Sequence, residues 1–149
     1  MDKTFVKDAL FDFLQTIYKF EQKELKEFSI SWQEMLLLKN LLIHKECTMG
    51  LVTTILEIKP FQATRLVDGL VKKEFVERST NEDDKRVKSI AITLKGKACM
   101  EKVDDFHHSV IENAAKDLGT QRTKEILETM FHLEQLLGLS EINKEVENL

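Results

Sequence analysis

The sequence predicts a mainly α-helical protein that also contains one β-hairpin. Apolar residues recur at steps of three and four along most of the chain, which is the spacing that places them on one face of a helix. The 149 residues include one proline and five glycines, so few positions interrupt a helix, and a sheet of many strands, which needs frequent turns, is disfavoured. Around residues 75–93 the apolar residues alternate instead, as they do in paired strands.

Length and composition are those of one globular protein. A chain of 149 residues can bury a core without disulfides, and 42% hydrophobic with 32% charged residues excludes a disordered chain. We expect one domain over residues 1–149. Cys47 and Cys99 lack the CxxC spacing, and we expect both to be reduced, buried and unreactive. Because no apolar run approaches the roughly 18 residues of a membrane span, we expect a cytoplasmic protein without a membrane partner.

Two helices are expected before residue 45. The first covers residues 3–28, where the apolar residues keep the helical period. The second follows Ser31, which lies three positions before Glu34 in the spacing of a capping box, and it runs to about residue 44. Trp32, at its start, is expected in the core.

The next two helices are short and close together. Thr48 can cap a third helix over residues 49–56, and Pro60, a residue suited to the first turn of a helix, begins a fourth over residues 59–73. Two helices joined by so short a turn have the outline of a helix-turn-helix. The apolar face of the fourth helix consists of Ala63, Leu66, Val67 and Leu70.

The alternating segment that follows completes a winged helix-turn-helix module over residues 29–96. Its hairpin has a long polar tip, the wing, at residues 81–88. Thr93 can cap a fifth helix that runs to about residue 116, and a sixth, after the break at Gly119, extends to about residue 138. The expected fold is therefore about six helices and a hairpin wing.

The terminal helices carry more apolar surface than a small winged module can cover. Exposed surface of this kind usually binds a partner, and pairing with a second copy of the chain would bury it. We therefore expect residues 1–28 and 97–149 to be dimerisation helices. The alternative is that they pack on the module within one chain.

Charge is segregated along the sequence. Residues 59–97 hold ten Lys or Arg and six Asp or Glu, a local charge of +4, whereas the whole chain carries −4. A basic module attached to an acidic remainder is typical of a DNA-binding protein, because lysine and arginine neutralise the phosphates. On charge alone, chance clustering on a solvated face remains an alternative.

Residues 58–96 carry motifs of a known family. Residues 64–68, Thr-Arg-Leu-Val-Asp, look like its recognition helix, Asp84-Lys85-Arg86 matches its D-x-R wing signature, and residues 92–96 are similar to its LTxKG junction. The chain thus resembles the MarR family of bacterial regulators over nearly its whole length. Glu74 stands where the family has glycine, and Gly69 lowers the stability of the fourth helix by roughly 1 kcal/mol relative to alanine.

The resemblance implies a homodimeric, sequence-specific DNA-binding transcription regulator, expected to be a repressor. Its two recognition helices would enter successive major grooves of a pseudo-palindromic operator, about 34–36 Å apart, and its wings would reach the minor grooves. Release by a small molecule, by family analogy a phenolic or other aromatic acid, is part of this expectation. No cofactor is expected.

Eleven residues are candidates for DNA contact. Gln62 and Arg65 suit base edges, since Gln can pair with adenine and Arg with guanine, although an ion pair between Arg65 and Asp68 is an alternative. Thr64, Lys72 and Lys73 suit phosphate, and Arg86 suits a narrow minor groove. The full set is Phe61, Gln62, Thr64, Arg65, Gly69, Lys72 and Lys73 on the helix and Asp84, Lys85, Arg86 and Lys88 on the wing.

Other classes of function fit less well. The sequence has no phosphate loop, GxSxG or HExxH motif, so no catalytic residue is proposed and an enzyme is not expected. Asp104 and His108, four positions apart on a helix, suggest a metal-responsive regulator, while the adjacent His107 points in a different direction. Two candidate ligands are too few for a site, and no metal ligand is assigned. A winged protein-protein adaptor remains the other alternative, and the polar and basic outer face of the fourth helix disfavours it.

Overall fold

The computed structural model describes residues 1–80 and 88–139. The chain divides into two compact units, Met1–Met100 and Glu101–Leu149. Helix α5 (Leu94–Leu118) begins in the first unit and continues into the second. No described helix is long and apolar enough to cross a membrane.

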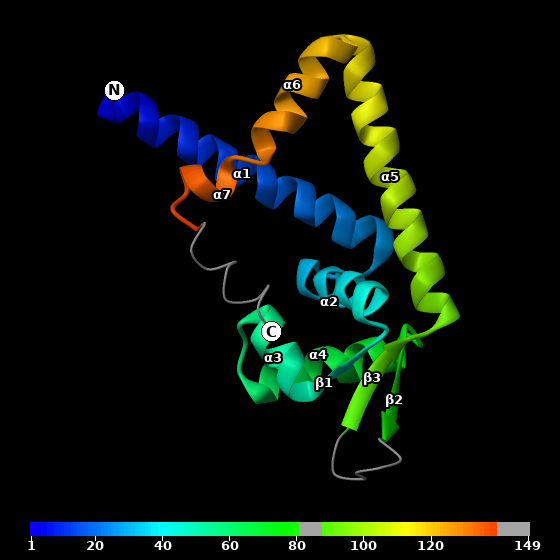
Figure 1. Cartoon of the computed structure of the whole chain (residues 1–149). Helices are drawn as coiled ribbons and strands as arrows, with labels where there is room; N and C mark the ends of the chain where they lie inside the picture. The colour runs from blue at the N-terminus through cyan, green and yellow to red at the C-terminus, as the bar shows by residue number, and fades with distance from the viewer. Residues whose placement is uncertain (81–87, 140–149) are drawn as a thin grey trace. The chain divides into compact units, whose positions relative to one another are not determined.

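The first unit contains the winged helix-turn-helix (Figure 1). Its elements in chain order are α1 (Lys3–Phe28), α2 (Trp32–His44), β1 (Glu46–Thr48), α3 (Met49–Leu56), α4 (Pro60–Lys72), β2 (Val76–Thr80) and β3 (Lys88–Ile92). Helices α2, α3 and α4 pack around a small sheet, and the fully buried side chains Leu38, Val67 and Ile90 come from α2, α4 and β3 respectively.

Local capping chemistry fixes where these helices begin. The Ser31 side chain accepts from the Glu34 N–H at 3.1 Å, and the Glu34 carboxylate accepts from the Ser31 N–H at 2.8 Å, so the capping box is confirmed. Thr48 caps α3 through the Leu51 N–H at 3.2 Å, as expected. These side chains satisfy amide groups that the first turn of a helix cannot pair. The predicted helix starts therefore match the structure.

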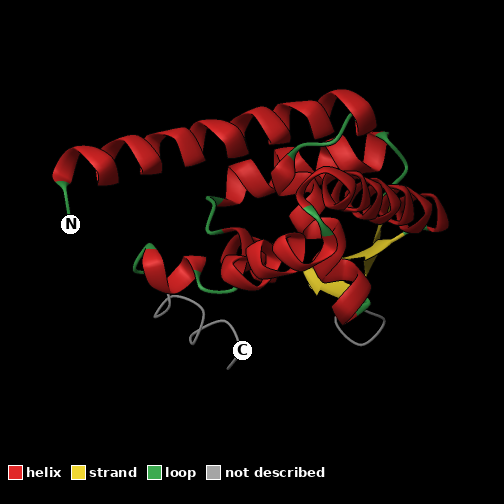
Figure 2. Ribbon diagram, turned by 90° about the horizontal axis from the view of Figure 1, so that it is seen from above, coloured by secondary structure: helices red, strands yellow, loops and turns green. Residues whose placement is uncertain are grey.

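The sheet has three strands in the order β1-β3-β2, all antiparallel. Figure 2 shows the strands in yellow among the helices in red. The β2–β3 pair is the expected hairpin, with Arg78 opposite Ile90. Strand β1 was not expected, because three residues between two helices are too few to show alternation. It forms only by pairing with β3, where Cys47 lies opposite Ile90.

Two expectations about single elements are wrong. Trp32 is 50% exposed and does not belong to the core, because it lies on the flank of α2 beside the buried face formed by Met35, Leu38 and Leu41. In the second unit the expected sixth helix is two helices, α6 (Thr120–Met130) and α7 (Leu133–Leu136), separated by a turn. The hydrophobic period continues through this turn and therefore does not reveal it.

The fold class is as predicted: mainly α, with a winged helix-turn-helix and a small antiparallel sheet. The tip of the wing, residues 81–87, and the tail, residues 140–149, lie outside the described residues. The assignment of residues 1–28 and 97–149 to dimerisation stays a prediction.

Candidate nucleic-acid interface

Helix α4 presents one apolar and one polar face. Ala63, Val67 and Leu70 are completely buried, which anchors the helix in the core of the first unit. The side opposite them carries exposed residues from the first two turns: Phe61, Gln62, Thr64 and Arg65. Because side chains three and four apart share a face, these four form a continuous outer surface.

Arg65 is the cation of this surface. Its expected alternative partner, Asp68, instead forms an ion pair with Arg78 of β2. Among the residues that the structure describes, no hydrogen bond or ion pair occupies the Arg65 guanidinium. An exposed guanidinium of this kind has all its donors available for a base edge or a phosphate.

Gln62 and Thr64 have bonds within their own helix. The Gln62 side-chain oxygen accepts from the Lys59 N–H at 3.0 Å, which satisfies an amide at the start of α4. The Thr64 hydroxyl donates to the Pro60 carbonyl at 3.0 Å. Gln62 therefore keeps its amide NH₂ for a ligand, while its oxygen is engaged. Adenine recognition through both groups would require this cap to open.

A hollow of about 210 Å³ lies beside the polar face of α4. Thr64 from α4, Arg78 from β2 and Lys88 from β3 contribute polar groups to its lining, together with Met49, Ser89 and Ile90. Arg78 is held there by Asp68, so a helix and a strand jointly position its charge. The eleven candidates for DNA contact include neither Arg78 nor Asp68. Their spacing in the sequence does not reveal that β2 runs beside α4 and brings the two side chains together.

The C-terminal end of α4 differs from its start. Lys72 is exposed, as a phosphate-binding lysine needs to be. The Lys73 amine donates to both Glu34 carboxylate oxygens at 2.9 Å and to the Ser29 carbonyl at 2.7 Å. A Cβ added at Gly69 would lie 3.5 Å from the Glu34 carboxylate, so Gly69 faces the same group.

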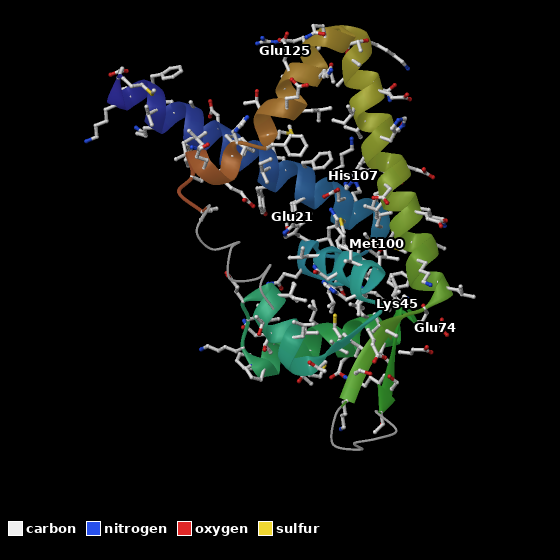
Figure 3. All side chains as sticks on the ribbon, viewed as in Figure 1. Glu21, Lys45, Glu74, Met100, His107 and Glu125 are labelled. Carbon is white, nitrogen blue, oxygen red and sulfur yellow. The ribbon has the colours of Figure 1, made fainter. Side chains whose placement is uncertain are left out.

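Glu74 forms the exit from the recognition helix into the wing (Figure 3). Its φ of 62° is left-handed, the conformation for which glycine is usually chosen. Its carbonyl accepts from the Thr93 hydroxyl at 2.6 Å, and its carboxylate pairs with Lys95 at 2.9 Å. The hydrogen bond from Lys95, and then the charge of that lysine, lower the pKa of the Glu74 carboxyl.

The remaining candidates are placed as follows. Lys88 is exposed at the start of β3, whereas Asp84, Lys85 and Arg86 lie outside the described residues. Across residues 1–80 and 88–139, no three side chains of the metal-binding types come together. Cys47 is buried, and burial followed by the nearby charge of Glu46 raises the pKa of its thiol. The roles of all the DNA-contact candidates stay predictions.

The geometry of this unit, with a recognition-type helix anchored in the core and a strand pair beside it, defines a winged helix-turn-helix protein. The model of the MarR family matches residues 30–88, which cover α2 to the start of β3. An uncharacterised HTH-type transcriptional regulator of Bacillus subtilis, YhbI, is 30% identical over 100 residues. The alignment spans 64% of this chain and 64% of that relative. Over its winged helix-turn-helix, residues 30–88, the chain is thus similar to the MarR family.

Solved structures share the fold. FabT of Streptococcus pneumoniae, determined in complex with DNA, has a TM-score of 0.72 at 21% identity and covers 92% of this chain and 98% of its own. A mutant of MarR from E. coli, complexed with operator DNA, has a TM-score of 0.65 at 20% identity and covers 92% and 99%. At these identities the likeness establishes the fold.

Proposed function

We propose that this protein is a sequence-specific regulator of transcription that binds double-stranded DNA. The observation that carries the proposal is the outer face of α4, where the Arg65 guanidinium is exposed beside Gln62 and Thr64 on a helix anchored by buried residues. An anchored helix with this composition fits a major groove. There an arginine can pair with guanine, and other polar side chains can contact phosphates and so position the protein on the DNA.

Charge supports the same proposal. Arg78 and Lys88 line the hollow next to α4, and Lys72 extends the basic surface to the end of the helix. The wing signature, Asp84 to Arg86, would add a minor-groove contact. The DNA-bound structures of FabT and of the MarR mutant are precedents for this use of the fold.

We further propose a homodimer that pairs through its terminal helices. Helix α1 is amphipathic, yet Glu24 is its one buried residue, and Phe11, Leu14, Tyr18 and Leu25 stay at least 39% exposed. Phe11, Leu14, Tyr18 and Leu25 follow each other at steps of three, four and seven, the spacing of a helix-pairing seam. A second copy would bury this seam and place two recognition helices about one DNA turn apart.

Repression and release by an aromatic acid complete the proposal by analogy with the family. An adaptor function is not favoured, because the α4 surface is polar and basic. The proposal includes no catalytic step and no cofactor.

The test is a titration of the protein with fragments of the intergenic DNA upstream of its own coding region, at two salt concentrations. We expect salt-sensitive binding to a short inverted repeat, with Arg65→Ala losing roughly 1–3 kcal/mol of discrimination at one base position. Arg122→Ala, which removes an equal charge from α6, is the matched control and should bind like the wild type. Absence of binding at low salt to every fragment would contradict the proposal.

A further inference from the structure

Lys73 makes a contact that joins segments far apart in the sequence. Its amine lies 2.9 Å from each oxygen of the Glu34 carboxylate and 2.7 Å from the Ser29 carbonyl. The Lys73 side chain is 34% exposed and that of Glu34 is 11% exposed, so this ion pair is partly withdrawn from water. Such pairs are screened less by salt than surface pairs are.

The acceptors of Lys73 form the corner between α1 and α2. Ser29 ends α1 in a left-handed conformation, with φ at 55°. Glu34 belongs to the capping box that begins α2, and its second oxygen also accepts from the Ser31 N–H at 2.8 Å. Lys73 is the residue that ends α4. One amine therefore fixes the end of the recognition helix to the corner.

Gly69 makes room for this contact. It lies one turn before Lys73 on the same side of α4, and a Cβ at this position would already reach 3.5 Å from the Glu34 carboxylate. A larger side chain would extend further toward the carboxylate that Lys73 needs. The two candidates Gly69 and Lys73 thus share one environment, which faces the protein.

We propose that Lys73 is a positioning residue that acts through Glu34, holding α4 in the orientation in which its outer face meets DNA, and that it does not itself bind phosphate. This role rests on the proposed DNA-binding function. The proposal can be separated from a simple effect of charge. If only the overall charge mattered, removing the Glu34 carboxylate near a DNA-binding helix would strengthen DNA binding. If Glu34 holds Lys73 in place, the same change weakens DNA binding.

The experiment measures DNA affinity over a range of salt for the wild type, Lys73→Met, Glu34→Gln and the double variant, with the full-length protein and its operator fragment. Gln at position 34 can still complete the capping box, so Glu34→Gln removes the ion pair and keeps the helix start. We expect each single variant to lose affinity on the order of tenfold, the size of one lost charge-assisted hydrogen bond. The double variant should lose little more, because both changes remove one contact.

Salt dependence separates positioning from phosphate contact. Removing a phosphate-binding lysine lowers the slope of log affinity against log salt by about 1. We expect this for Lys72→Ala, which is the matched neighbour, and an unchanged slope for Lys73→Met and Glu34→Gln. Lys73→Arg, which can donate to the same acceptors, should restore most of the affinity.

Several results would overturn the proposal. Glu34→Gln binding as tightly as the wild type, or Lys73→Met lowering the slope by about 1, would show that Lys73 acts as an ordinary cation. Thermal melts measure the folded fraction of each variant, and a stoichiometric titration with DNA measures the fraction that can bind. If the affinity loss vanishes once the protein concentration is corrected for these fractions, positioning is also contradicted. A wild type that binds no DNA defeats the proposed function itself, and the role of Lys73 falls with it.

Discussion

Glu74 adopts a left-handed backbone conformation that is unfavourable for a residue with a side chain. A left-handed φ costs a residue with a side chain more than it costs glycine. Here the conformation is held by bonds from both sides: the Glu74 N–H donates to the Val71 carbonyl at 2.9 Å, and its carbonyl accepts from Thr93 at 2.6 Å. These two bonds therefore hold the exit from α4 in a left-handed conformation without a glycine.

The ion pair of Glu74 with Lys95 predicts a dependence of stability on pH. The pKa of Glu74 lies below its ordinary value of 4.5 in the folded protein, so the pair stabilises the fold above pH 4.5. This stabilisation is lost as the pH falls through the lowered pKa, because protonation then costs the folded state its ion pair. We expect the thermal midpoint of the wild type to exceed that of Glu74→Gln at neutral pH and the difference to disappear in acid. A difference that is constant from neutral pH to pH 3 would contradict this assignment.

At the scale of elements, the junction between the wing and α5 depends on one close approach. A Cβ at Gly96 would lie 2.2 Å from the Phe75 carbonyl oxygen and 2.8 Å from the Ile92 side chain. The backbone atom cannot move aside without disturbing the Thr93 N–H, which donates to the same carbonyl at 3.0 Å. The glycine of the LTxKG motif is therefore required where α5 packs against Phe75, just before β2, and against Ile92 at the end of β3.

Gly96→Ala is expected to destabilise the protein by about 1–3 kcal/mol, because the added methyl group overpacks a rigid site. Gly50→Ala is the matched control, since a Cβ at that exposed helical position would meet its first neighbour at 3.9 Å. It should be neutral or stabilise by up to about 1 kcal/mol, because alanine favours a helix more than glycine does. Urea denaturation of both variants measures the two effects, and equal midpoints would refute the packing argument.

At the scale of the whole molecule, the proposed homodimer rests on the unburied face of α1. Leu14 is 54% exposed and Tyr18 is 61% exposed, although both lie on the apolar side of the helix. Water contact with so many large apolar side chains is unfavourable, at roughly 25 cal/mol for each Å² left uncovered. A second copy of the chain is the proposed cover.

The double variant Leu14→Glu/Tyr18→Glu should therefore sediment as a monomer at concentrations at which the wild type is a dimer. It should also lose most of its affinity for a two-half-site operator, because in the proposed dimer each subunit would read one half-site. Leu94→Glu, at an 84% exposed position outside α1, is the control and should remain dimeric. A double variant that still sediments as the wild type does would place the interface elsewhere.

The sequence alone determined the first five helices, the helix-turn-helix among them, and the hairpin, because these depend on capping residues, period and a proline, all of which act within a few positions. Its motifs also predicted that α4 reads DNA and that Arg65 contacts a base; Arg65 is exposed, and both roles stay predictions. The wing tip and the dimer stay predictions, since the described structure contains neither.

Tertiary structure decided the contacts between distant residues. Strand β1 forms only because β3 pairs with it. Asp68 forms its ion pair with Arg78 on a strand and not with Arg65 on its own helix, and Trp32 lies outside the core. Lys73 donates to Glu34 across 39 positions of sequence, and this contact is the basis of the positioning role proposed for it. A linear pattern encodes which face of each element is apolar, but the partners of its polar groups are set when the elements pack.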